Sequence, residues 1–119
     1  MDAVGYKKLT VWPKADDLAY QVYVETRSFP REEMYGITSQ LRRSALSVPT
    51  NIVEGCGRQG KKELKHFANI ALGSLAEARY LVDFSARLEY LNADQYKKLQ
   101  SLGEEVGRLL WGFYQSLSP

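Results

Sequence analysis

Proline is absent from residues 50–118 of this chain, and the four prolines that are present are Pro13, Pro30, Pro49 and Pro119. A proline inside a helix removes a backbone hydrogen bond and clashes with the preceding turn, so a long stretch without proline permits long helices. The same stretch holds few β-branched residues, which also favours helix. No alternation of apolar and polar residues extends far enough to indicate a sheet. We therefore expect an all-α chain.

Apolar residues at spacings of three and four predict two helices in the first half of the chain. The first is expected over residues 13–28. The second is expected to be capped by Thr38 or Ser39 and to reach a turn marked by glycines near residue 57. Its apolar stripe stays in phase across Pro49, so we expect a bend at this proline and not an end.

The second half of the chain predicts two longer helices. The third helix is expected over residues 61–90, which corresponds to a length of about 45 Å. The fourth is expected to begin at Asn92, because Asn92 and Gln95 have the three-residue spacing of a capping box. A helix as long as the third needs partners of similar length to cover its apolar face.

Four helices joined by short loops predict an antiparallel up-down four-helix bundle, formed by residues 1–119 as a single domain. The first helix is about half as long as the third, so some apolar surface is left for another subunit. No apolar run approaches the roughly 18–20 residues of a membrane span, and the first residues lack the apolar core of a signal peptide. A cytoplasmic protein without a membrane partner is therefore expected.

Cysteine and histidine each occur once, as Cys56 and His66. One cysteine excludes an internal disulfide framework and a cysteine-based zinc site, and one histidine excludes a histidine-rich metal cluster. We expect Cys56 to be a small buried side chain and His66 to be a structural or surface residue. The chain also lacks a recognisable phosphate loop or metal motif. No catalytic residue, metal or cofactor is expected, and the protein is not predicted to be an enzyme.

Positive charge is concentrated in the middle of the chain. The formal net charge is only +2, but residues 38–66 alone carry six basic and two acidic side chains. Fixed positive charge binds phosphates, mainly without sequence discrimination. We name these six residues as candidates for nucleic-acid binding, and a solvated cluster without a ligand is the alternative reading: Arg42, Arg43, Arg58, Lys61, Lys62 and Lys65.

A second polar constellation lies on the second and third predicted helices. Asn51 and Glu54 are three residues apart, so they can share a helix face, and Arg43 falls close to the same face. Glu77 occupies an otherwise apolar region of the third helix. We predict a buried network of Arg43, Asn51, Glu54 and Glu77 between the two helices, with a structural role in fixing their register.

Several of these residues belong to longer motifs, at residues 9–12, 40–45, 47–55, 73–77 and 88–91. Taken together and in this order, the motifs resemble the signature of the four-helix-bundle proteins encoded in 23S rRNA intervening sequences. The resemblance covers about residues 6–117. The chain departs from the pattern at Gly60, where a serine or threonine cap is expected.

The resemblance implies an up-down four-helix bundle and a ring-shaped homopentamer. The family is similar to the accessory proteins of diversity-generating retroelements, which are basic pentameric barrels that bind nucleic acid and a reverse transcriptase. Membership by itself does not establish an enzymatic activity. Two functions are thus expected as alternatives. One is binding of RNA or DNA through the basic residues. The other is a scaffold that contacts another protein through Trp111, Tyr114 and the groove beside the first helix.

Overall fold

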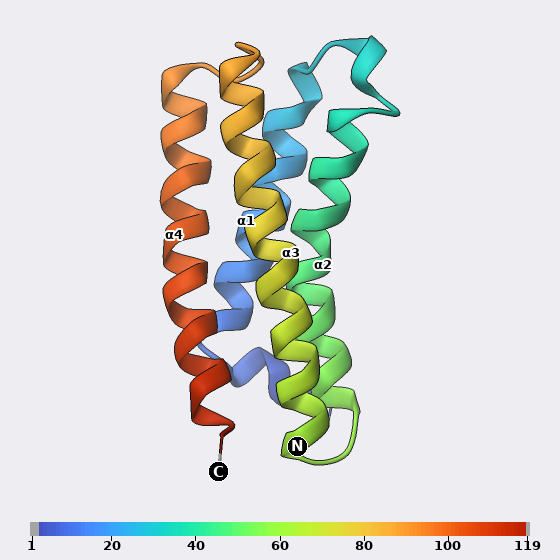
Figure 1. The fold of residues 1–119 in the computed structure, drawn as a ribbon, viewed down its shortest axis with the longest axis vertical. Coiled ribbons are helices and arrows are strands. Elements are labelled where there is room, and N and C mark those ends of the chain that lie inside the picture. Colours follow the sequence, from blue (N-terminus) through green and yellow to red (C-terminus); the bar gives the residue numbers. More distant parts are fainter. Residues whose placement is uncertain (1–2, 119) are drawn as a thin grey trace.

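The computed structural model describes residues 3–118, which are helical over most of their length (Figure 1). Four α-helices account for most of the chain: α1 (Val11–Glu25), α2 (Ile37–Gly57), α3 (Lys61–Arg87) and α4 (Ala93–Ser116). Short 3-10 segments precede α1 and connect it to α2: η1 (Ala3–Lys8), η2 (Thr26–Ser28) and η3 (Arg31–Glu33).

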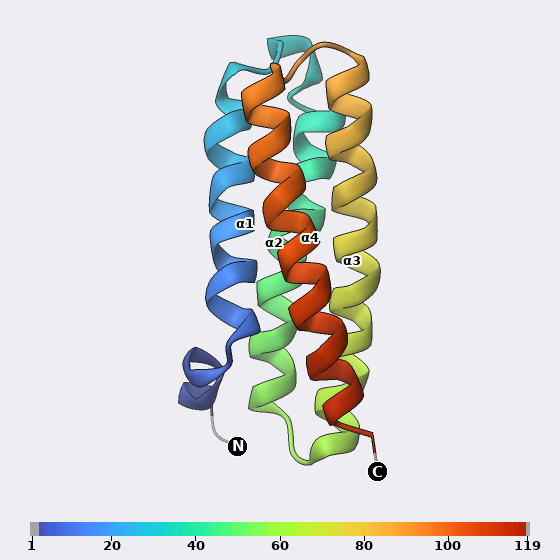
Figure 2. The same ribbon diagram turned by 90° about the vertical axis from the view of Figure 1, so that its left-hand side faces the viewer.

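The four helices run alternately up and down and pack as a closed bundle of 44 × 24 × 20 Å (Figures 1 and 2). Each helix contacts its neighbours in the sequence, and α1 also contacts α4, which closes the bundle. The most extensive contact joins α2 and α3. The all-α, up-down architecture predicted from the sequence is therefore confirmed.

The core is built from the apolar stripes that the spacing predicted. The largest side chains that are fully buried come from α2 and α4: Leu41, Ile52, Leu99 and Leu110. Near the lower end of the bundle, α2 and α3 approach closely at Gly55, where an added Cβ would lie 2.9 Å from the Cβ of Phe67. This close approach holds the start of α3 against the end of α2 and thereby places the turn between them.

Helix α2 continues without a break through Pro49, as predicted, and the expected bend at this residue stays a prediction. Its start differs from the expectation. The helix begins at Ile37, and the Ile37 backbone N–H donates to Oε1 of Glu33 at 3.3 Å. Thr38 is buried in the first turn and does not cap the helix. A glutamate from the preceding 3-10 segment thus takes the role that was assigned to Thr38 or Ser39.

The connection between α3 and α4 shows one correct prediction and one shifted boundary. The capping box is confirmed, since Asn92 Oδ1 accepts from the Gln95 N–H at 2.8 Å and Gln95 Oε1 accepts from the Asn92 N–H at 2.8 Å. Helix α3 ends at Arg87, earlier than the expected residue 90. The cause is Glu89, which adopts a left-handed backbone with φ of 63°.

Candidate nucleic-acid interface

The α2–α3 turn lies at the same end of the bundle as η1 and the last turns of α4 (Figures 1 and 2). Segment η1 packs on α2, and Lys8 lines a groove with Phe113 and Ser116 of α4. We call this part of the molecule the basic end and define it by six side chains: Lys7, Lys8, Arg58, Lys61, Lys62 and Lys65. The acidic residues in the same segments, 3–8 and 54–66, are Glu54 and Glu63.

Two of these lysines, Lys7 and Lys8, are not among the nucleic-acid-binding candidates predicted from the sequence. Lys7 and Lys8 lie some fifty residues before the α2–α3 turn. Only the topology brings them to the same end, because α1 runs up the bundle and α2 returns (Figure 2). The paired lysines were visible in the sequence, but no local pattern indicates where a 3-10 segment of six residues will pack.

Lys61 and Lys62 form the exposed start of α3. Within residues 3–118, neither side chain has a hydrogen-bond or ion-pair partner. The turn before them is made by Gly60, whose φ of 90° favours glycine. Positive charge at the start of a helix opposes the helix dipole. These two lysines therefore do not stabilise the helix that carries them, and their charges are available to a ligand.

The other two cations of the turn are already in contact with neighbouring side chains. Arg58 pairs with Glu54 at 3.2 Å and lies over the ring of Phe67 at 5.1 Å. Lys65 donates to Oγ of Ser118 at 2.8 Å. The contacts of Arg58 and of Lys65 are at the surface. There, an ion pair or a cation–π contact contributes little to stability and can exchange for a contact with a phosphate.

Arg42 and Arg43 do not belong to the basic end. Arg42 lies sixteen residues before Arg58 on the same helix, which separates them by about 24 Å along its axis. Its Nε donates to Oγ1 of Thr26 at 2.8 Å, and its guanidinium lies over the ring of Tyr23 at 4.9 Å. The structure thus divides the six residues named from the sequence into a group of four at the turn and a pair on the upper half of α2.

The buried network predicted between α2 and α3 is absent from the described structure. Arg43, Glu54 and Glu77 are all exposed, and Glu54 pairs with Arg58 at the surface. Asn51 instead donates to Oγ of Ser47 at 2.8 Å. The Ser47 and Ser74 hydroxyls are 2.8 Å apart and link the two helices.

The physical reason lies in side-chain size and charge. Small hydroxyls fit where α2 and α3 lie close together, whereas burial of a guanidinium or a carboxylate is costly and their long stems can reach water. The polar contact between the two helices is thus made by the neutral pair Ser47 and Ser74, with Asn51 beside it. The signal in the sequence is the presence of Ser47 and Ser74 among the apolar residues of these two helices.

Cys56 and His66 offer little chemistry. Burial raises the pKa of the Cys56 thiol, so the reactive thiolate is disfavoured at neutral pH. His66 is exposed and meets Phe67 edge-on, with ring centroids 5.2 Å apart. Within the described residues, no three histidine, cysteine, aspartate or glutamate side chains are grouped to hold a metal ion.

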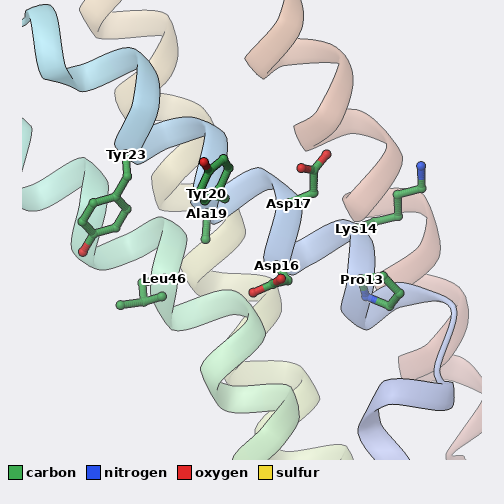
Figure 3. Close-up of a pocket in the computed structure, with 8 residues that line it drawn as sticks. All are labelled: Pro13, Lys14, Asp16, Asp17, Ala19, Tyr20, Tyr23 and Leu46. Carbon is green, nitrogen blue, oxygen red and sulfur yellow. The ribbon is translucent and has the colours of Figure 1, made fainter.

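A second surface lies on the outer face of α1 and α2. A groove of about 620 Å³ lies there. Tyr20 and Tyr23 of α1 and Leu46 of α2 line it (Figure 3). A further groove of about 580 Å³ shares Tyr23 and Leu46 and continues past Met34 and Tyr35. All five side chains are exposed. We call this surface the α1–α2 face, and its apolar and aromatic side chains are interspersed with charged residues such as Asp16 and Arg43.

Comparison with known proteins decides the family. The model of the family described as 23S rRNA-intervening sequence protein matches residues 7–112. The chain belongs to this family. The family resemblance that the sequence motifs indicated is thereby confirmed. No curated protein matches the chain.

A solved structure has the same fold as this member of the 23S rRNA-intervening sequence protein family. It is a crystal structure at 1.70 Å resolution of a protein with unknown function from the S23 ribosomal protein family of Bacteroides thetaiotaomicron VPI-5482. The two chains are 24% identical and superpose with a TM-score of 0.78, over 88% of this chain and 98% of the other. Within residues 3–118 of this family member, no helix is long and apolar enough to cross a membrane.

Proposed function

We propose that this protein is a non-enzymatic, cytoplasmic binding protein that holds the phosphates of RNA or DNA at its basic end. The observation that carries the proposal is the exposed pair Lys61 and Lys62, which have no partner within the described residues. Four more cations flank this pair. A cytoplasmic location suits the single buried thiol of Cys56.

The placement of the charge favours a ligand over a solvated surface. Lysines at a helix start are unfavourable for the fold, so their presence is better explained by what they bind. Backbone phosphates are recognised by fixed positive charge and require no base contact. We therefore expect affinity without marked sequence preference and with a strong dependence on salt.

Charge reversal at the start of α3 tests this function. The Lys61→Glu/Lys62→Glu double variant is expected to bind a labelled 20-nucleotide RNA and a 20-base-pair DNA at least about tenfold more weakly at low salt. Two fewer phosphate contacts also make the plot of log affinity against log salt shallower by about 1–2. Fluorescence anisotropy over a salt series measures both quantities.

The matched control is a second pair of adjacent lysines. Lys97 and Lys98 lie near the start of α4, at the opposite end of the bundle (Figure 1). The Lys97→Glu/Lys98→Glu variant changes the net charge equally and is expected to bind within about twofold of the wild type. Equal losses in the two variants, or no binding by the wild type at low salt, would contradict the site.

We also infer that the protein assembles with copies of itself through the α1–α2 face. Its support is the group of exposed apolar and aromatic side chains on this face, a kind of surface that monomeric proteins seldom leave uncovered. Charges of both signs lie among them, with Asp16 beside Tyr20 and Arg43 beside Leu46, which suits a contact between identical chains. A ring of five copies is proposed on the family resemblance, and it requires a second surface on each chain that receives the α1–α2 face of the next copy, because heterologous contacts close a ring. The alternative is a scaffold that contacts a different protein through Trp111, Tyr114 and the groove beside α1 and does not bind nucleic acid.

A further inference from the structure

Two aromatic side chains of α4 form a stacked pair at the surface close to the basic end. Trp111 and Tyr114 have ring centroids 5.6 Å apart and planes inclined by only 22°. Trp111 is 51% exposed, although indole is among the costliest side chains to leave in water. The core does not use the Trp111 ring, so one of its faces is open to a planar ligand.

Cations surround this aromatic pair. The ammonium of Lys65 lies 5.0 Å from the centroid of the Tyr114 ring. Lys61 is one helical turn before Lys65 on α3, and Arg108 is one turn before Trp111 on α4. The aromatic rings and the positive charges therefore share one face of the α3–α4 pair at the lower end of the bundle.

Negative charge is scarce on the same face. From residue 106 to residue 118, the charged side chain is Arg108 alone. On the first turns of α3, Glu63 lies two residues from Lys65, and residues two apart point to different sides of a helix. Glu104, four residues before Arg108 on α4, borders this face on the side away from the basic end. An anionic ligand that approaches Trp111 from the basic end therefore meets Lys61 and Lys65 first.

We propose that Trp111 and Tyr114 are a stacking platform for the bases of single-stranded nucleic acid, whose phosphates lie along Lys61, Lys65 and Arg108. This inference rests on the proposed function and specifies its ligand. Single strands expose base faces that a duplex keeps stacked inside, and aromatic rings within a positively charged groove are the usual means of holding them. An apolar protein partner would gain nothing from the surrounding cations, so the charge favours a polyanion with planar groups.

The test compares a single strand with a duplex. A 15-nucleotide oligothymidylate and a 15-base-pair DNA are titrated against the full chain, with anisotropy of the labelled DNA and tryptophan emission as readouts. Trp111→Ala is expected to weaken binding of oligothymidylate by about tenfold and to change duplex binding by less than about twofold. Trp111→Phe keeps a ring and is expected to recover most of the affinity.

Tryptophan emission reports the contact directly. The chain has two tryptophans. The other one, Trp12, has a buried indole nitrogen and packs on Tyr6, with ring centroids 4.8 Å apart. Oligothymidylate is expected to quench the wild type, and the quenching is expected to vanish in Trp111→Phe, where only Trp12 emits. The matched control is Tyr80→Ala, which removes an exposed aromatic ring on α3 that is not part of the platform. This variant is expected to bind like the wild type.

Failure of this inference can be told apart from failure of the proposed function. If both DNAs bind in a salt-dependent manner that requires Lys61 and Lys62, but Trp111 is neither quenched nor needed, the platform is disproved and the phosphate site stands. If neither DNA binds at low salt, both proposals fall. Melting temperatures of the Trp111 variants within a few degrees of the wild type verify that the variants are folded.

Discussion

Two glycines at the end of α2 differ in what surrounds them, although they are only two residues apart. At Gly55, a Cβ would meet the Cβ of Phe67 at 2.9 Å and Cδ1 of Leu64 at 3.0 Å. At Gly57, a Cβ would have nothing within 4 Å. The first glycine is thus required by the contact between α2 and α3, and the second is not.

We predict that alanine has opposite effects at these positions. Gly55→Ala is expected to lower the free energy of unfolding by about 1–3 kcal/mol, because the added methyl group overpacks the contact between helices. Gly57→Ala is expected to raise it by about 0.5 kcal/mol, because alanine restricts the unfolded chain at no steric cost. Urea denaturation measures both, and a stabilised Gly55→Ala variant would show that the helices separate easily.

Tyr90 provides a pH-dependent contact at the opposite end of the bundle. Its hydroxyl donates to Oε2 of Glu33 at 2.9 Å, and this hydrogen bond, together with desolvation, raises the pKa of Tyr90. The phenolate cannot donate and is repelled by the carboxylate. The stabilisation is therefore complete below the ordinary tyrosine pKa of about 10 and is lost as pH rises through the raised pKa.

We predict that Tyr90→Phe makes stability less sensitive to alkaline pH. The free energy of unfolding is expected to fall between pH 9 and pH 11 in the wild type and to fall less in the variant. Urea denaturation across this range gives the comparison. Tyr35→Phe, at an exposed residue of the connection between α1 and α2, is the control and is expected to follow the wild type. Parallel pH profiles for all three proteins would contradict the role of the hydrogen bond.

At the scale of the elements, sequence patterns located helices well when the signal was local. The capping box of α4 was found because both of its partners lie within three residues of each other. The start of α2 was not found, because Glu33 caps Ile37 from a separate 3-10 segment and also accepts from Tyr90. A carboxylate that joins three elements leaves no local pattern in the sequence.

Substitutions at the starts of α4 and α2 distinguish a residue that caps its helix, Asn92, from one that was expected to cap and does not, Ser39. Asn92→Ala is expected to lower the free energy of unfolding by about 1 kcal/mol, because the Gln95 N–H loses its acceptor. Ser39→Ala is expected to change it by less than about 0.5 kcal/mol, because α2 has no side-chain cap at this residue. Thermal or urea denaturation is sufficient, and a larger effect at Ser39 would contradict the observed start of α2.

At the scale of the whole molecule, the architecture could be predicted and the layout of the candidate site only in part. Helical periodicity and the lack of proline were sufficient for the bundle. Arg42 and Arg58 belong to the same basic stretch of the sequence, but about 24 Å along the axis of α2 separates them. Lys7 and Lys8 are far from the α2–α3 turn in the sequence, and only the fold brings them to the basic end.

Self-association through the α1–α2 face can be tested by a single substitution. Leu46→Lys places a charge in the α1–α2 face and is expected to convert the wild-type oligomer to a monomer, measured by light scattering coupled to size-exclusion chromatography. Leu88→Lys changes a comparably exposed leucine outside this face and is expected to leave the oligomer intact. A monomeric wild type would contradict self-association.

The common location of η1, the α2–α3 turn and the last turn of α4 has a practical consequence for attaching the protein to a surface (Figures 1 and 2). A tether joined near residue 3 or residue 118 would crowd the lysines under test. Leu88 is 40% exposed, lies at the far end of the bundle and is outside the α1–α2 face. A Leu88→Cys variant can carry a maleimide linker there, since the native thiol of Cys56 is buried and does not compete. The protein would then be attached to the sensor by its far end, and the lysines of the basic end would face the solution.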